Sequence, residues 1–152
     1  MDKSIVIERL ISSLNELYRN DKVLFTMEVN ERTICSQLAY YMKKYFVWYN
    51  VDCEYNRNMW SPKECWRFLT PYPDILIHQR LNNDNNLVFI ETKTKWSNFS
   101  KEAKKEDIDK INCFMENAPY EYKYWLFVIF GKDKSKCEFF YKEDGRIRCQ
   151  SL

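Results

Sequence analysis

Two segments of the chain space their apolar residues by three and four positions, the pattern of amphipathic helices. The first covers residues 4–18, and its apolar positions are Ile5, Ile7, Leu10, Ile11, Leu14 and Leu17. The second covers residues 31–45, and its apolar positions are Ile34, Leu38, Tyr41, Met42 and Tyr45. Asn30 is a suitable N-cap for the second helix, and the helix dipole favours an acid such as Glu31 in its first turn.

Five shorter segments carry the apolar runs or the strict alternation that predict β-strands. They cover residues 46–55, 73–77, 87–93, 122–130 and 139–141. The asparagine-rich residues 82–86 predict a hairpin turn between the second and third strands. A third helix is expected over 100–116, crossing from the third strand to the fourth. The predicted fold class is therefore α/β, with a mixed β-sheet of four to five strands flanked by helices and an extra N-terminal helix.

Composition narrows the class of protein but does not point to a function. The 152 residues suit a single domain over 1–152, with a helical elaboration at 1–20 and a core at 30–130. No apolar run reaches membrane-span length, so no membrane partner is expected. The chain lacks a signal-peptide pattern, which favours a cytoplasmic location in which the six cysteines are free thiols. The net charge of +2 neither indicates nor excludes a nucleic-acid partner.

Charged residues interrupt two of the apolar strands at their ends. Asp74 precedes the run 75–77, and Glu91, Thr92 and Lys93 follow the run 87–90. Burying a charge costs several kcal/mol unless it is paired or binds a metal, so this pattern is unusual for a strand that only packs. Because side chains alternate along a strand, Glu91 and Lys93 share one face and Thr92 points to the other.

The predicted hairpin brings Asp74 close to Glu91 and Lys93 in either of two registers. A turn centred between Asn82 and Asn83 places Asp74 opposite Glu91. A turn centred one residue later places Asp74 opposite Lys93 instead. The three charged groups therefore cluster whichever register the hairpin adopts.

Such a cluster favours a metal site over an ordinary ion pair. Two neighbouring carboxylates repel each other unless a cation lies between them. Mg²⁺, or Mn²⁺ in its place, suits Asp74, Glu91, the backbone carbonyl of Thr92 and water as ligands. Lys93 could then orient or deprotonate an attacking water, or offset charge on a phosphate. The alternative is a solvent-exposed salt bridge on the sheet face.

Glu31 is a candidate fourth member of this cluster. It lies three residues before Ile34 and seven before Leu38, and so shares the apolar face of its helix. A carboxylate on that face needs a cation, which a metal or Lys93 would supply; contact with its own helix end is the alternative. Glu28 is the other candidate for this accessory acid.

These residues resemble the PD-(D/E)XK nuclease superfamily, whose fold is restriction-endonuclease-like. The resemblance rests on Pro73-Asp74, on Glu91-Thr92-Lys93 after an interval of sixteen residues, and on Glu31 on a preceding helix. The resemblance covers the core at 30–130. Within the superfamily, the chain looks like the small standalone members. It implies Asp74 and Glu91 as metal ligands, Lys93 as the catalytic lysine and Glu31 as an accessory acid.

Four further residues are candidates for contact with a nucleic acid. His78 and Arg80 share a strand face with Asp74, and arginine suits bidentate phosphate contact; an exposed polar pair is the alternative. Trp96 is placed to stack on a base, and Arg57 enters through the family resemblance alone. The charges of the helix at 100–116, in contrast, alternate in sign as on a solvated face.

We therefore predict a metal-dependent endonuclease that hydrolyses DNA with Mg²⁺. The alternatives are an RNA-cleaving or branched-DNA-selective nuclease with the same site, and a non-catalytic binding or inhibitor protein of the same fold. A homodimer is a further prediction, because a chain of this size has little surface for recognising a long DNA site.

Overall fold

The computed structural model describes residues 1–64, 72–97, 100–116 and 120–152. Its helices are α1 (Lys3–Asn20), α2 (Lys22–Thr26), α3 (Glu31–Tyr45) and α4 (Lys101–Glu116). Its strands are β1 (Asn50–Cys53), β2 (Arg57–Asn58), β3 (Ser61–Pro62), β4 (Ile75–His78), β5 (Val88–Thr94), β6 (Tyr124–Phe130), β7 (Ser135–Glu143) and β8 (Arg146–Ser151).

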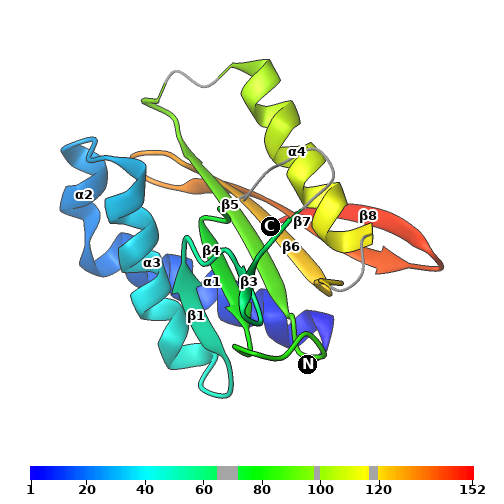
Figure 1. Cartoon of the computed structure of the whole chain (residues 1–152). Coiled ribbons are helices and arrows are strands. Elements are labelled where there is room, and N and C mark those ends of the chain that lie inside the picture. The colour runs from blue at the N-terminus through cyan, green and yellow to red at the C-terminus, as the bar shows by residue number, and fades with distance from the viewer. Residues whose placement is uncertain (65–71, 98–99, 117–119) are drawn as a thin grey trace.

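A six-stranded mixed sheet forms the centre of the fold, in the order β1-β4-β5-β6-β7-β8 (Figure 1). Strands β5 and β6 are parallel and are joined through α4, whereas the other neighbouring pairs are antiparallel. The predicted α/β class, mixed sheet and helical crossover are confirmed. The sheet has more strands than the four to five predicted, because β7 is longer than expected and β8 pairs with it. Strands β2 and β3 form a separate hairpin.

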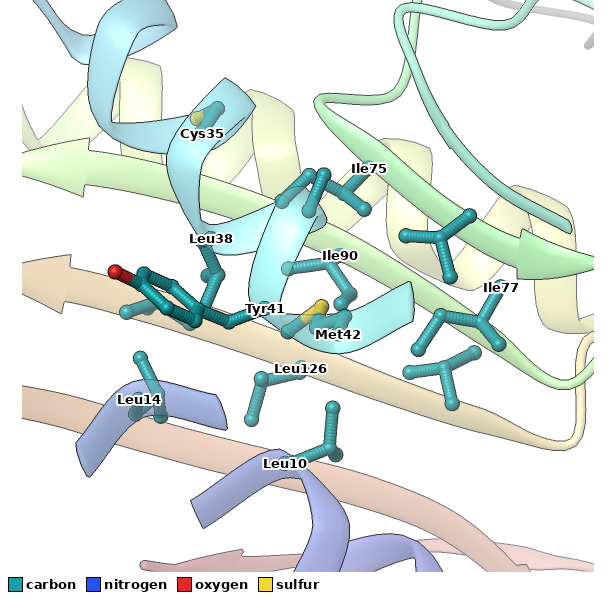
Figure 2. Close-up of a cluster of buried hydrophobic side chains, with 14 of the residues drawn as sticks. Leu10, Leu14, Cys35, Leu38, Tyr41, Met42, Ile75, Ile77, Ile90 and Leu126 are labelled. Atoms are coloured by element: carbon teal, nitrogen blue, oxygen red, sulfur yellow. The ribbon is translucent and has the colours of Figure 1, made fainter. Parts of the chain in front are cut away.

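Helices cover both faces of the sheet, α1 to α3 on one face and α4 on the other (Figure 1). The larger hydrophobic cluster joins α1 and α3 to inward-facing strand residues such as Ile75, Ile90 and Leu126 (Figure 2). The smaller cluster, on the opposite face, includes Phe114 of α4 packed on Phe89 of β5. The central strands β4, β5 and β6 are thus largely buried on both sides, and β5 lies between the two layers of helix.

The N-terminal helix packs into the larger cluster through a stripe that matches the prediction in part, at Leu10, Leu14 and Leu17. Its buried apolar residues are Val6, Leu10, Leu14 and Leu17. Ile5 and Ile11 remain 40% and 38% exposed, so their inclusion in the stripe was wrong. Spacings of four, four and three residues place the buried set along one side of the helix.

The start of α3 follows the prediction closely, and the start of β1 does not. The Asn30 side chain accepts a hydrogen bond from the Thr33 backbone N–H at 2.9 Å, which confirms the N-cap. The predicted strand at 46–55 is reduced to the four residues of β1, because the residues before it form a turn. Trp48 lies in this turn and is 79% exposed, so the alternation there did not mark a strand face.

Strand β5 is longer than the neighbour β4, and this leaves part of its edge open (Figure 1). The β4–β5 ladder runs from Ile77 opposite Val88 to Ile75 opposite Ile90. This register matches a turn centred between Asn82 and Asn83, the first of the two predicted. Beyond it, residues 91–94 keep their β6 partners but have no β4 partner. The open edge is where the predicted site residues lie.

The structure bears on two expectations, that the chain does not span a membrane and that its cysteines are free thiols. In the part of the chain that the structure describes, none of the helices is both long enough and apolar enough to span a membrane. Cys35, Cys53 and Cys137 are free thiols. Cys113 takes part in a disulfide bond, so the prediction that all six cysteines are free is wrong.

Candidate functional site

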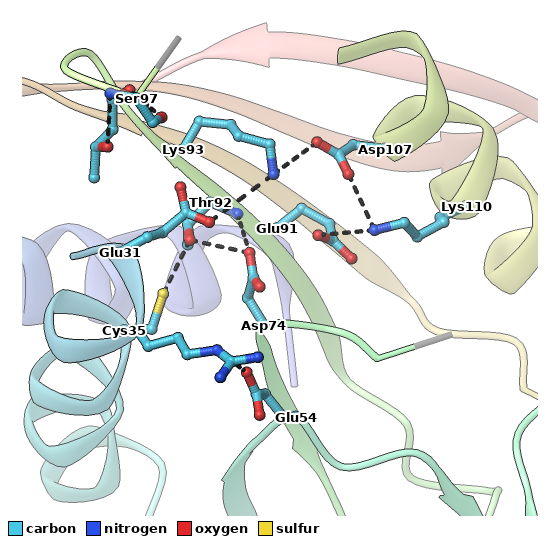
Figure 3. Close-up of polar contacts among 12 residues, drawn as sticks. Glu31, Cys35, Glu54, Asp74, Glu91, Thr92, Lys93, Ser97, Asp107 and Lys110 are labelled. Carbon is cyan, nitrogen blue, oxygen red and sulfur yellow. Dashed lines mark hydrogen bonds and ion pairs between the residues drawn. The ribbon is translucent and has the colours of Figure 1, made fainter. Parts of the chain in front are cut away.

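Asp74 closes the open edge of β5 by accepting hydrogen bonds from Thr92. Its Oδ2 atom lies 2.7 Å from the Thr92 backbone nitrogen and 3.0 Å from the Thr92 hydroxyl (Figure 3). Burial raises the pKa of Asp74, although the hydrogen bond from the Thr92 N–H opposes the rise. In an extended strand the N–H and C=O of one residue project to the same edge, so the Thr92 carbonyl also points to this side. Asp74 and a strand carbonyl therefore converge where a metal was predicted.

Glu31 contacts the same open edge from α3. It accepts a hydrogen bond from the Thr94 backbone, and its Oε1 atom lies 4.0 Å from Lys93 Nζ. Burial raises the pKa of Glu31 to about 6, against the opposing charge of Lys93. Glu28 instead pairs with Lys132 at 2.7 Å on the surface. The structure thus brings Glu31, not Glu28, to the site, and the Glu31 carboxylate faces β5.

Glu91 is the most deeply buried acid of the site, with 1% of its surface exposed. Its Oε2 atom lies 3.5 Å from Lys110 Nζ. Its Oε1 atom is one of few buried side-chain oxygens in the described residues that have no hydrogen-bond partner. Burial, followed by the charge of Asp74, raises the pKa of Glu91 well above its ordinary value. A buried carboxylate oxygen without a partner is costly, and a bound cation would satisfy it.

Lys93 projects from the same face of β5 and is held by Asp107 of α4 (Figure 3). Asp107 Oδ2 lies 3.0 Å from Lys93 Nζ, and Asp107 Oδ1 lies 3.0 Å from Lys110 Nζ. Burial lowers the pKa of Lys93, but the hydrogen bond and charge of Asp107 and the charge of Glu31 outweigh it, and the net shift is upward. Lys93 is therefore a cation at neutral pH.

Sequence reasoning missed Asp107 and Lys110, because it assigned the charges of α4 to a solvated face. That prediction is wrong for Asp107, which is 4% exposed and faces the sheet. Asp107, Lys110 and Phe114 are spaced by three and four residues and so lie on one side of the helix. The local signal was weak: Phe114 shares this side of the helix, but its packing on Phe89 of β5 is a tertiary contact.

The charges of the site are suited to one divalent cation. The carboxylates are those of Glu31, Asp74, Glu91 and Asp107, and the ammonium groups are those of Lys93 and Lys110. When all are ionised, two negative charges are left without a counterpart. In the described ranges no three histidine, cysteine or acidic side chains converge as a metal-binding group. A metal here would therefore have only two side-chain ligands, Asp74 and Glu91. The Thr92 carbonyl and water would complete the set, which suits Mg²⁺.

His78 and Arg80 do not join this site. His78 is 3% exposed, and its Nε2 atom lies 3.0 Å from Asp52 Oδ2. Arg80 donates from Nε to the same carboxylate at 2.8 Å. At about 3.3 Å per residue, His78 lies about 13 Å along the strand from Asp74, and Arg80 lies farther away. The prediction that they touch a phosphate near the metal does not agree with these contacts.

Arg57 and Trp96 also lie apart from the acidic cluster. Arg57 is exposed on the small β2–β3 hairpin. Trp96 is partly buried, and its indole N–H donates to the Val29 carbonyl at 3.0 Å. That hydrogen bond holds the Trp96 ring against the segment before α3. The structure therefore offers no contact between either residue and the site.

Comparisons of the chain with family models, with curated proteins and with solved structures find no match. The resemblance to PD-(D/E)XK nucleases thus rests on the residues quoted above and on their arrangement.

Proposed function

We propose that this chain is a metal-dependent nuclease with a restriction-endonuclease-like core, which hydrolyses phosphodiester bonds in DNA. The observation that carries the proposal is the arrangement at the open edge of β5. Asp74 comes directly before the β4–β5 ladder, which begins at Ile75 opposite Ile90, and it accepts a hydrogen bond from the Thr92 backbone N–H. Glu91 and Lys93, on either side of Thr92, share one face of β5. The element order β4, β5, α4, β6 supports the same family resemblance. An ion pair serving stability alone would not need four carboxylates.

Asp74, Glu91 and the Thr92 carbonyl are the groups that would hold Mg²⁺, with Mn²⁺ able to replace it. The fit is supported by the Glu91 oxygen that has no hydrogen-bond partner and by the excess of negative charge. When bound, the ion supplies Lewis-acid stabilisation of phosphate charge and lowers the pKa of a coordinated water.

The protein's own residues supply positioning and charge. Lys93, kept cationic by Asp107, donates hydrogen bonds to a phosphate oxygen and offsets the charge that grows in the transition state. Its raised pKa argues against the role of general base. Glu31 has a pKa of about 6 and is ionised at neutral pH, so it is suited to take a proton from the attacking water.

The test is cleavage of single-stranded, duplex and branched DNA and of RNA, each with Mg²⁺ and with EDTA. Glu91→Gln and Lys93→Ala should reduce turnover at least about 100-fold, the scale of losing one preorganised electrostatic group. Glu8→Gln changes an exposed acid of α1 and should leave turnover unchanged. Metal-dependent cleavage that persists in Glu91→Gln, measured on folded protein, would refute the proposal.

One observation favours a second candidate, a non-catalytic protein of the same fold. Lys93, Asp107 and Lys110 form a continuous chain of ion pairs that reaches Glu91, and these lysines neutralise part of the acid charge internally. Calorimetric titration with Mg²⁺ and Mn²⁺ separates the two candidates, because the nuclease requires saturable binding that Glu91→Gln abolishes. The homodimer stays a prediction, which light scattering would test.

A further inference from the structure

A pocket of about 390 Å³ opens beside the acidic site, between α3 and the segments that flank β1 and β4. Its lining includes Glu31, Arg32 and Ser36 of α3, Glu54 after β1, and Tyr72 and Asp74 before β4. Figure 3 shows Glu54 on the same side of the site as Asp74 and Glu31. The volume is at the small end of the range for ligand pockets, enough for one nucleotide unit. Because the candidate catalytic acids form part of its wall, an occupant would adjoin the reacting phosphate.

The charges of the pocket select which part of a substrate it can hold. Among the described residues, three carboxylates and one guanidinium line it, and these charges would repel a phosphate inside. An uncharged group that carries hydrogen-bond donors suits this lining better. Nucleobases present amino and imino donors on their edges, and carboxylates accept from them.

Tyr72 supplies the flat surface that a nucleobase needs. Tyr72 is 56% exposed and lines the pocket, so it is accessible to an occupant. Stacking of bases on aromatic rings is tolerant of sequence and is a main source of affinity for single strands. Tyr72 therefore complements the acidic edge of the pocket.

An ion pair fixes one wall of the pocket. Arg32 Nε lies 2.8 Å from Glu54 Oε1, which holds that carboxylate at the wall. This contact uses one of the five donor hydrogens of Arg32, and the others remain for an acceptor at the rim.

We propose that this pocket receives one unpaired nucleobase of the substrate strand, whose adjoining phosphate lies at Asp74 and Glu91. The inference rests on the proposed nuclease function and specifies its substrate as single-stranded or locally unpaired nucleic acid. A base inside an intact duplex is paired and stacked, and extruding it costs free energy. DNA and RNA both present such bases, and the test below separates them.

The test is fluorescence anisotropy with labelled oligonucleotides, in Ca²⁺ instead of Mg²⁺ so that binding is measured without turnover. A single strand of about 12 nucleotides should bind at least about tenfold more tightly than the blunt duplex of the same sequence. Tyr72→Ala should weaken single-strand binding by about 5- to 150-fold, the scale of losing one base stack. Tyr72→Phe keeps the ring and should retain affinity. Tyr40→Ala, at a 65% exposed position of α3 outside the pocket, is the matched control.

Equal affinity for strand and duplex, or a Tyr72→Ala variant that binds the single strand as tightly as wild type, would overturn the inference. A preference for the deoxy strand or for the ribo strand supports the pocket and identifies the substrate. Thermal unfolding of each variant establishes that a loss of binding is not a loss of fold. Failure of the nuclease proposal is a separate result: no cleavage of any substrate in Mg²⁺, whatever the binding comparison gives.

Discussion

Asp107 fixes the direction of Lys93: the carboxylate Oδ2 and the ammonium Nζ lie 3.0 Å apart. Lys93 comes from the sheet and Asp107 from α4, so the pair joins two layers of the fold. The second Asp107 oxygen holds Lys110 at the same distance, and Lys110 in turn reaches Glu91. Helix α4, which follows β5, thus orients the ammonium groups of Lys93 and Lys110 and also covers this face of the sheet.

Asp107→Asn should lower kcat by about 10- to 100-fold and leave KM nearly unchanged. The asparagine keeps the shape of the side chain but loses the charge that orients Lys93, and outer partners of a site commonly have effects of this size. Steady-state kinetics on the substrate found in the cleavage screen would check it. Glu106→Gln, at an exposed neighbouring position of α4, is the control. An effect confined to KM would show that Asp107 acts on substrate binding instead.

Lys110→Met should strengthen Mg²⁺ binding several-fold. The Lys110 ammonium lies 3.5 Å from Glu91 Oε2, so it competes with a divalent cation for a proposed ligand. Methionine keeps much of the apolar stem while removing the charge. Calorimetric titration of both proteins gives the two dissociation constants. Lys105→Met, exposed on the same helix, should leave Mg²⁺ affinity unchanged. Weaker binding in Lys110→Met would contradict the competition.

Glu91→Gln should stabilise the metal-free protein while abolishing turnover. The pKa of Glu91 is raised well above its ordinary value of 4.5 by burial and by the charge of Asp74. Its ionised form therefore opposes folding, and this cost grows as pH rises above 4.5. Removing the charge in EDTA at pH 7 should raise the free energy of unfolding by about 0.5–2 kcal/mol. Urea denaturation measures the change, with Glu8→Gln as control. A destabilised Glu91→Gln protein would show that the carboxylate is structural.

The sequence predicted the acidic cluster well because its geometry is local. Both hairpin registers that the short turn allows bring Asp74 near Glu91 and Lys93, and the structure adopts the first of them. The Asn30 cap and the bounds of α3 are similarly local. Strand β8 was missed although Asp144-Gly145 is a strong hairpin signal, and Gly145 has a φ of 71° in that turn.

The inner side of α4 required tertiary information. Alternating signs of charge are typical of a solvated helix, and nothing local distinguishes Asp107 from its exposed neighbour Glu106. Only the packing of Phe114 on Phe89 shows which side of α4 faces the sheet. Similarly, strand alternation placed His78 on the Asp74 face. It did not show that His78 forms a hydrogen bond with Asp52 of the neighbouring strand β1.

Asp52 should make the fold sensitive to acid, independently of the candidate active site. Burial raises the pKa of Asp52, but the hydrogen bonds from His78 and Arg80 outweigh this effect, so the pKa of Asp52 lies well below its ordinary value of 3.8. A carboxylate with a lowered folded-state pKa stabilises the protein above its unfolded pKa. That contribution is lost as pH falls below about 3.8.

Between pH 5 and pH 2 the wild type should therefore lose more stability than Asp52→Asn, which has no proton to bind at this position. The difference between the two free energies of unfolding should change by up to about 1.4 kcal/mol per pH unit, the limit for one titrating group. Urea denaturation at a series of pH values measures both curves, and subtraction removes the effect of the other carboxylates. Asp84→Asn, at an exposed turn position, should follow the wild-type curve. Parallel curves for wild type and Asp52→Asn would mean that the bonds from His78 and Arg80 do not hold Asp52 ionised in the folded protein.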